Sequence, residues 1–389
     1  MTAASRTAGS APHAQSGPAG RTPEETHGEV TPLELFFDLV FVFAVSRLSH
    51  HLLEHVTWRG VAETLVLLLA VFAVWYYTTW TAVLVPVDRP GPRAMVLTVM
   101  VPGLFMNASV TRAFDATGWS FVVPLLLIQL GRTAWTIRNA PNATFREHFV
   151  RTLLWLVATA PLWIIGAAAS PEPRLAWWAL AAGLDLVGTW LAHPVPGRRL
   201  QSAHIAFPGG HLLERCRLFL IVALGETILT TGTAVASAPT TLMTAVTGTA
   251  AMVGVMALWL LGFGRAGHLA VREVEATSDP VRAARHAADA LLVMVAGLIA
   301  VAVANEMVIA HPHGHTTTAM SLLLFGGPVL FLLAQAWYLW LLASDAPRLR
   351  LAGSAALVVI AAAALLAPPY VTMLLAGASL ATLAVLDQR

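Results

Sequence analysis

Apolar stretches long enough to cross a lipid bilayer follow one another almost without a break from Glu34 to the end of the chain. A spanning helix needs about 20 residues, because each residue advances the helix by about 1.5 Å. These runs are continuous, whereas the strands of membrane barrels alternate polar and apolar residues over about ten positions. Helices therefore remain as the way to satisfy the backbone in lipid, and we predict an all-α, polytopic helical membrane protein with about twelve transmembrane helices. The candidate spans cover approximately residues 33–53, 60–85, 93–112, 118–138, 148–169, 174–193, 212–236, 240–264, 284–309, 318–343, 349–367 and 369–387.

The composition agrees with this class and disfavours several others. Hydrophobic residues make up 57% of the 389-residue chain and charged residues only 11%, whereas a soluble domain contains about 25% charged residues. A soluble enzyme and a nucleic-acid-binding domain are therefore disfavoured. All 23 basic residues are arginines, which excludes lysine chemistry, and the formal net charge of +2 indicates no acidic partner. The expected partners are the lipid bilayer and a small solute or ion, with no nucleic acid and no cofactor.

The first 30 residues differ from the rest, because they are rich in Ala, Gly, Ser, Thr and Pro and contain no apolar run. We predict a disordered cytoplasmic tail over residues 1–30 and a helical transmembrane domain over residues 31–389. In the twelve-span arrangement, 18 of the 23 arginines fall in the two tails and the even-numbered loops. Arginine-rich loops stay in the cytoplasm. Arginine in place of lysine also suggests a high-GC bacterium, so we expect a multi-pass protein of the bacterial inner membrane with both termini cytoplasmic.

Charged residues inside the spans are costly in lipid and are therefore the candidates for function. Glu34 and Asp38 lie four residues apart in the first span and share one helix face. Two carboxylates on one face repel each other unless one holds a proton or a cation lies between them. Arg132 in the fourth span reaches a similar depth and is the expected countercharge. This group would be either an ion pair that locks helices together or a site that handles protons or cations.

The seventh span carries a second set of charges. His211 and Arg215 lie four residues apart, and Glu214 and Arg217 lie three apart, so local pairs are expected at its start. Glu226 lies about 18 Å further along the helix, among Gly, Thr and apolar residues. We expect Gly225 to let another helix approach closely and Glu226 to face the bundle interior, either protonated or paired with another helix.

The ninth span and the histidines supply the remaining candidates. Arg285 and Asp289 are spaced to pair, and His286 beside them is a candidate proton relay, while Glu306 lies at the other end of this span. Histidines after the first and ninth spans are weak candidates for a metal site, with solvated histidines at the membrane interface as the alternative; they are His50, His51, His311 and His313. In the second span, an aromatic group is expected either to pack or to line a pocket: Trp75, Tyr76, Tyr77 and Trp80.

Two of these segments resemble the bacterial low temperature requirement A (LtrA) family. The first runs from Thr31 as TPLELFFDLVFVFA, with Ser49-His50 closing the span, and the second runs from His211 as HLLERCRLFLIVALGE. The chain departs from the family pattern at Cys216-Arg217, where the family tends to have an aromatic residue and a glycine. The resemblance implies an integral membrane protein, and it names neither a substrate nor a reaction. The family-type positions that it implies are Glu34, Asp38, His50, Glu214, Arg215 and Glu226.

Leu-Glu opens both the first and the seventh span, at Glu34 and at Glu214, which raises the possibility of two parallel six-helix halves like those of some transporters. Three functions remain open. The carboxylates inside the spans, which lie in two layers near the two membrane surfaces, and the number of spans favour a secondary transporter or permease. Such a transporter could be coupled to protons. The alternatives are an intramembrane enzyme that acts on a lipid or another apolar substrate, and a structural or sensory protein whose charges lock its helices.

Overall fold

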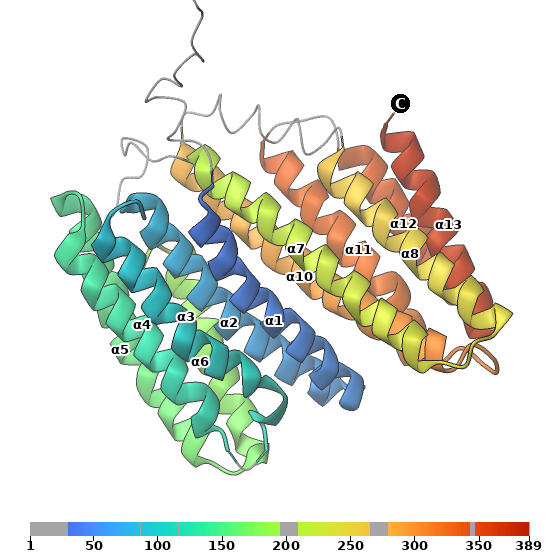
Figure 1. The fold of residues 1–389 in the computed structure, drawn as a ribbon, viewed down its shortest axis with the longest axis horizontal. Coiled ribbons are helices and arrows are strands. Elements are labelled where there is room, and N and C mark those ends of the chain that lie inside the picture. The colour runs from blue at the N-terminus through green and yellow to red at the C-terminus, as the bar shows by residue number, and fades with distance from the viewer. Residues whose placement is uncertain are drawn as a thin grey trace, which may run out of the picture.

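The structure, a computed structural model, describes residues 30–85, 87–115, 117–194, 209–264, 279–342 and 347–388. These residues form twelve α-helices and one short 3₁₀ helix (Figure 1). The predicted tail over residues 1–30 lies almost entirely outside the described residues. The helices are α1 (Pro32–Glu54), α2 (Trp58–Leu84), α3 (Pro90–Ala108), η2 (Val110–Arg112), α4 (Trp119–Asn139), α5 (Ala143–Ala168), α6 (Pro171–Trp190), α7 (Gly209–Ser237), α8 (Leu242–Phe263), α10 (Pro280–Ala310), α11 (Thr318–Leu341), α12 (Pro347–Ala364) and α13 (Pro369–Asp387).

The helix ends follow from local sequence chemistry. Thr31 caps α1 in a capping box, because its side chain accepts from the Glu34 backbone while the Glu34 carboxylate accepts from the Thr31 backbone. Proline occupies the first turn of several helices, where its missing N–H is not needed. The connecting prolines therefore set the boundaries, and all twelve predicted spans coincide with helices.

The helices form two groups of six, α1–α6 and α7–α13, which stand side by side (Figure 1). If the helices of each group are numbered from one to six in chain order, the same pairs of helices contact each other in both groups. These shared contacts join helices 1 and 2, 1 and 3, 2 and 3, 2 and 6, 3 and 4, 4 and 5, and 5 and 6. The groups meet where α1 and α2 pack against α7 and α10. This shared order of neighbours, with an even number of helices in each group, is the arrangement of parallel repeats.

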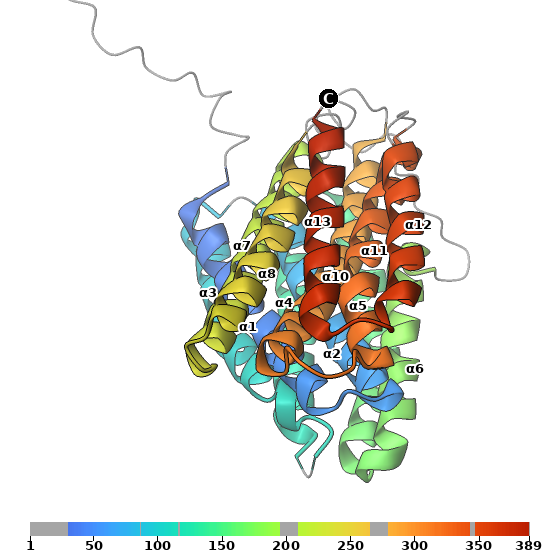
Figure 2. The ribbon, with the colours of Figure 1, turned by 90° about the vertical axis from the view of Figure 1, so that its right-hand side faces the viewer.

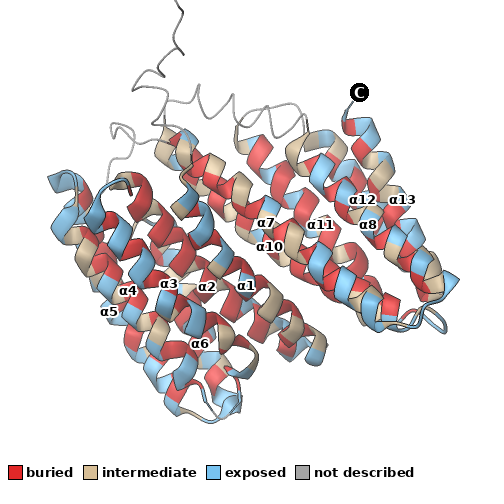
Figure 3. Cartoon of the chain, in the orientation of Figure 1, coloured by how far each residue is buried: buried red, intermediate tan, exposed pale blue. Residues whose placement is uncertain are grey.

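Nine of the helices in the described residues are long and apolar enough to cross a membrane. The exceptions are α1, α3 and α6, which carry charged residues within or near their apolar stretches. Each still turns large apolar side chains outward, for example Phe36 of α1, Phe105 of α3 and Leu180 of α6, all more than half exposed. Figure 3 shows exposed residues along the outer faces of both groups of helices. Exposed apolar surface of this kind belongs in lipid, so the chain is a polytopic helical membrane protein.

Both ends of the described chain lie at one end of the bundle, because twelve helices alternate in direction (Figures 1 and 2). We call this the terminal end, where α1 begins and α13 ends, and the opposite one the far end.

Candidate functional site

A buried ion network joins α1 to α7 near the terminal end. The Arg215 guanidinium donates from Nη1 to Glu34 Oε1 over 2.9 Å and from Nη2 to Asp38 Oδ1 over 2.6 Å. Trp75 Nε1 of α2 donates to the same Asp38 oxygen over 2.7 Å, and His211 Nε2 lies 3.0 Å from Glu34 Oε1. Glu34, Asp38 and Arg215 are at most 2% exposed. One arginine therefore lies between the two carboxylates and bonds to both, and His211 adds a second contact to Glu34.

The prediction that Arg132 pairs with Glu34 or Asp38 is wrong. Arg132 is buried, but its guanidinium donates to Gln129 Oε1 over 2.6 Å and to Thr133 Oγ1 over 3.1 Å, and it lies 5.1 Å from the centre of the Tyr77 ring. The reason is the packing order, because α7 lies directly beside α1 and brings Arg215 to the carboxylates. Arg132 instead donates from its two terminal nitrogens to neutral acceptors on α4 and α2, while its Nε has no hydrogen-bond partner among the described residues.

The predicted local pairs have mixed outcomes. Glu214 and Arg217 pair as expected, with 3.0 Å between carboxylate and guanidinium, on a partly exposed part of α7. The predicted pair of Arg285 with Asp289 is wrong: Arg285 donates to the Trp190 backbone oxygen, and Asp289 lies 3.5 Å from His286 Nδ1. Trp190 at the end of α6 contacts both residues, because its backbone oxygen accepts from Arg285 and its Nε1 donates to Asp289.

The expected surroundings of Glu226 are also not found. A Cβ atom added at Gly225 meets no other atom within 4 Å, so no described helix approaches closely there, and Glu226 is half-buried. In the part of the chain that the structure describes, its carboxylate forms no hydrogen bond or ion pair. Glu306 of α10 is half-buried as well, whereas its neighbour Asn305 donates to Thr231 of α7 over 3.2 Å.

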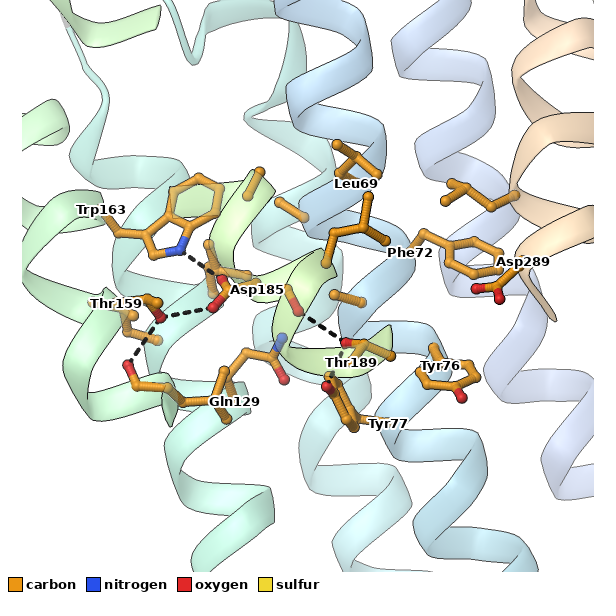
Figure 4. A pocket seen from close by; sticks show the side chains of 18 residues that line it. Leu69, Phe72, Tyr76, Tyr77, Gln129, Thr159, Trp163, Asp185, Thr189 and Asp289 are labelled. Carbon is orange, nitrogen blue, oxygen red and sulfur yellow. Dashed lines mark hydrogen bonds between the residues drawn. The ribbon is translucent and has the colours of Figure 1, made fainter. Parts of the chain in front are cut away.

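A cavity that the sequence did not delimit lies inside the first group of helices, and we call it the deep cavity. It is lined by α2, α4, α5 and α6 and by α10 of the second group (Figure 4). Asp185 of α6 projects into it, accepting from Thr159 Oγ1 over 2.7 Å and from Trp163 Nε1 over 3.1 Å. Asp289 lies at the opposite end of the cavity (Figure 4). Both carboxylates thus face one space between five helices.

A second cavity opens beside the first near the terminal end, and we call it the terminal cavity. It is lined by the ends of α2 and α6 and the starts of α5 and α10, and it shares Tyr76, Tyr77 and Thr189 with the deep cavity. The space that the centre of a water molecule can reach is about 50 Å³ in the deep cavity and about 260 Å³ in the terminal one. Tyr77 hydrogen-bonds Thr189 over 2.7 Å and His193 over 2.8 Å, so a polar set separates the two spaces.

The backbone is strained beside this polar set. Ala192 and His193 have φ angles of 55° and 54°, in the left-handed region that residues with side chains rarely adopt. His193 is held there by its backbone N–H to the Gly188 oxygen over 2.7 Å and by its ring contacts with Tyr77 and Thr152. Strain that the surroundings hold in place is a mark of functional sites.

Comparison with known proteins places the chain in a family. The model of the bacterial low temperature requirement A protein (LtrA) matches residues 29–385, which is nearly the whole chain. The chain belongs to the LtrA family. A relative from Rhizobium meliloti (strain 1021), the uncharacterized protein RA0937, is 30% identical over 358 residues, which cover 90% of this chain and 87% of that protein. No solved structure matches the chain.

The resemblance to LtrA proteins suggested six positions, and the structure brings only three of them together. Glu34, Asp38 and Arg215 form the buried network. Glu214 and Glu226 lie elsewhere on α7, and His50 at the far end contacts the backbone oxygen of Ser46 over 2.8 Å.

The histidines proposed for metal are not gathered into a site. Within residues that the structure describes, no group of three or more His, Cys, Asp or Glu side chains is placed to hold a metal ion. His51 lies 3.3 Å from Glu63, and the His313 ring lies edge-on to the Tyr370 ring, while His311 is the C-cap residue of α10.

Sequence reasoning missed the deep cavity for a physical reason. Asp185 stands out only as one acid near the middle of the sixth span, and its partners Thr159 and Trp163 lie on another helix. Tyr76 and Tyr77 carried a signal as aromatic residues that could line a pocket, and both line the two cavities together with Trp80 in the terminal one.

Proposed function

We propose that this LtrA-family protein is a secondary transporter whose solute path runs through the terminal and deep cavities. The observation that carries the proposal is the pair of cavities that meet at Tyr76, Tyr77 and Thr189. Together they lead from the terminal end to a carboxylate within the bundle. The deep cavity lies within the first group and reaches the second group at Asp289 and Leu292 of α10.

The position of the deep cavity fits movement of one group of helices against the other. Its walls come from the first group, except for Asp289 and Leu292 of α10. A rocking motion at the junction would therefore open or close this space. On the other side of the junction, the network of Arg215 with Glu34 and Asp38 joins the first helices of the groups, and we assign it the part of a hinge that stays closed.

The orientation and the coupling ion belong to the same proposal. The distribution of arginines puts the terminal end in the cytoplasm, so the terminal cavity opens inward. Asp185 and Asp289 in the deep cavity, and His148 and His193 in the terminal cavity, are groups beside the path that can exchange a proton, which suits proton-coupled transport. Of the residues that sequence analysis put on a pathway, His286 contacts Asp289, and Arg132 contacts Gln129 and Tyr77 of the deep cavity.

Cysteine labelling tests alternating access without knowledge of the solute. The single native cysteine, Cys216, is buried and is replaced by alanine. Ala73→Cys then reports from the deep cavity and Val281→Cys from the terminal cavity. Met256→Cys on the outer face of α8 is the control, because a residue in lipid does not react with a membrane-impermeant maleimide.

We expect Val281→Cys to be labelled from the cytoplasmic face alone, and Ala73→Cys to be labelled from both faces of the membrane. Labelling of Ala73→Cys from only one face of the membrane under all conditions would refute the transporter proposal. That result would favour an enzyme or a receptor with a one-sided cavity.

A further inference from the structure

We infer that the deep cavity binds a small organic ammonium ion, with Asp185 as its counterion. This inference names the substrate class of the path described above and therefore rests on the proposed function. It starts from the charges that face the cavity. Asp185 and Asp289 line it, and none of its lining residues is an arginine or a histidine.

The Asp185 carboxylate keeps acceptor capacity for a ligand. Each of its oxygens accepts one hydrogen bond, from Thr159 and from Trp163, whereas an ionised carboxylate offers about four acceptor sites. Both donors are neutral, so they orient the group without compensating its charge. Arg132 approaches this region only through Gln129 and Tyr77, and its guanidinium donates to acceptors other than Asp185. A cation that enters the cavity therefore finds an oriented charge.

The walls of the cavity suit a cation that carries an apolar group. Phe72, Tyr76, Tyr77 and Trp163 contribute aromatic rings, and most of the other lining residues are aliphatic. Aromatic faces attract ammonium groups, most strongly where water is excluded. A hard divalent cation needs several oxygen ligands gathered around it, whereas the two carboxylates lie at opposite ends of the cavity, and an anion would be repelled by both of them. Phosphate and carboxylate solutes are thereby disfavoured.

The volume sets the size of the ligand. A space of about 50 Å³ for water centres holds a few water molecules, since one occupies about 10–15 Å³ on this measure. Ethylammonium, with three heavy atoms, matches that size. A ligand so small reaches a Kd of about 1 mM at best, so the assay must detect weak binding.

The test uses full-length protein in lipid nanodiscs and ligand-observed saturation-transfer NMR with ethylammonium. Acetamide is the neutral probe of similar size and acetate the anionic one. Asp185→Asn removes the charge while keeping the shape, and Glu172→Gln on the exposed start of the same helix is the matched control. Phe72→Leu tests the aromatic wall against Phe105→Leu, whose ring points outward. Elution as a single species in gel filtration shows that each variant is folded.

We expect saturable binding of ethylammonium alone, weakened at least about tenfold by Asp185→Asn and several-fold by Phe72→Leu, with both controls unchanged. The inference is overturned if wild-type protein shows no saturable ethylammonium signal, if acetamide binds equally well, or if folded Asp185→Asn binds like wild type. If Ala73→Cys is labelled from both faces but ethylammonium does not bind, the protein is a transporter of another class of solute and the ligand inference is refuted. If ethylammonium binds but labelling is one-sided, the ligand inference is supported and the transporter proposal is refuted.

Discussion

Replacing Arg215 with methionine removes the guanidinium that bonds to both Glu34 and Asp38. The guanidinium makes contacts of 2.9, 2.6, 3.3 and 3.3 Å to these two residues, and all three side chains are buried. Removal of one partner from a buried ion pair costs about 3–5 kcal/mol, because the remaining charge stays uncompensated. Here two carboxylates are left facing each other, so we expect a loss of at least that size for Arg215→Met.

A double-mutant cycle isolates the pair from general effects of the substitutions. Asp38→Asn in the Arg215→Met background removes one stranded charge and keeps an acceptor for Trp75, so part of the stability should return. We expect a coupling of about 1–3 kcal/mol between positions 215 and 38 in reversible unfolding of the detergent-solubilised protein. The matched cycle with Arg132→Met should give a coupling within about 0.5 kcal/mol, because Arg132 bonds to neutral groups. Equal coupling in the two cycles, or a stable Arg215→Met protein, would refute this account.

Three further predictions concern packing, charge and topology. Gly297→Ala should destabilise the protein strongly, because its Cβ would lie 2.5 Å from the Gly327 backbone oxygen, whereas Gly225→Ala, with nothing within 4 Å, should be neutral in thermal unfolding. Glu226→Gln should change the free energy of unfolding by less than about 1 kcal/mol, because no described group pairs with this carboxylate; a larger loss would indicate a partner. Reporter fusions after Ala143 should read cytoplasmic and those after Glu172 and His313 external, and the opposite pattern would reverse the orientation.

The number and limits of the helices were predictable from sequence because they depend on local properties. Length, apolarity and proline placement are read within one segment, and they gave twelve spans whose ends agree with the helices to within a few residues. The pair of Glu214 with Arg217 was predictable for the same reason, since three residues on a helix bring side chains together. Local spacing alone was not sufficient for Arg285, which leaves its helix neighbour for a backbone oxygen of α6.

The partner of the carboxylates on α1 was not predictable from sequence. The sequence indicates how deep a residue lies in the membrane, but not which helices lie beside each other. Arg132 and Arg215 reach the terminal half of the bundle at comparable levels, and only the lateral order of helices decides which one meets Asp38. The same holds for close helix contacts. Gly225 and Gly297 are both glycines within apolar spans, yet only Gly297 faces a crossing helix.

The two groups of acids beside α2 therefore have different physical roles. Glu34 and Asp38 bond to one buried arginine, with His211 at Glu34 and Trp75 at Asp38, an arrangement that suits a fixed joint. Asp185 is held by neutral donors from α5 beside the deep cavity, and none of the described residues gives it a cationic partner. An acid without a countercharge at such a depth is costly. That difference, more than the family-type motifs, is the reason why we propose Asp185 of α6 as a binding residue.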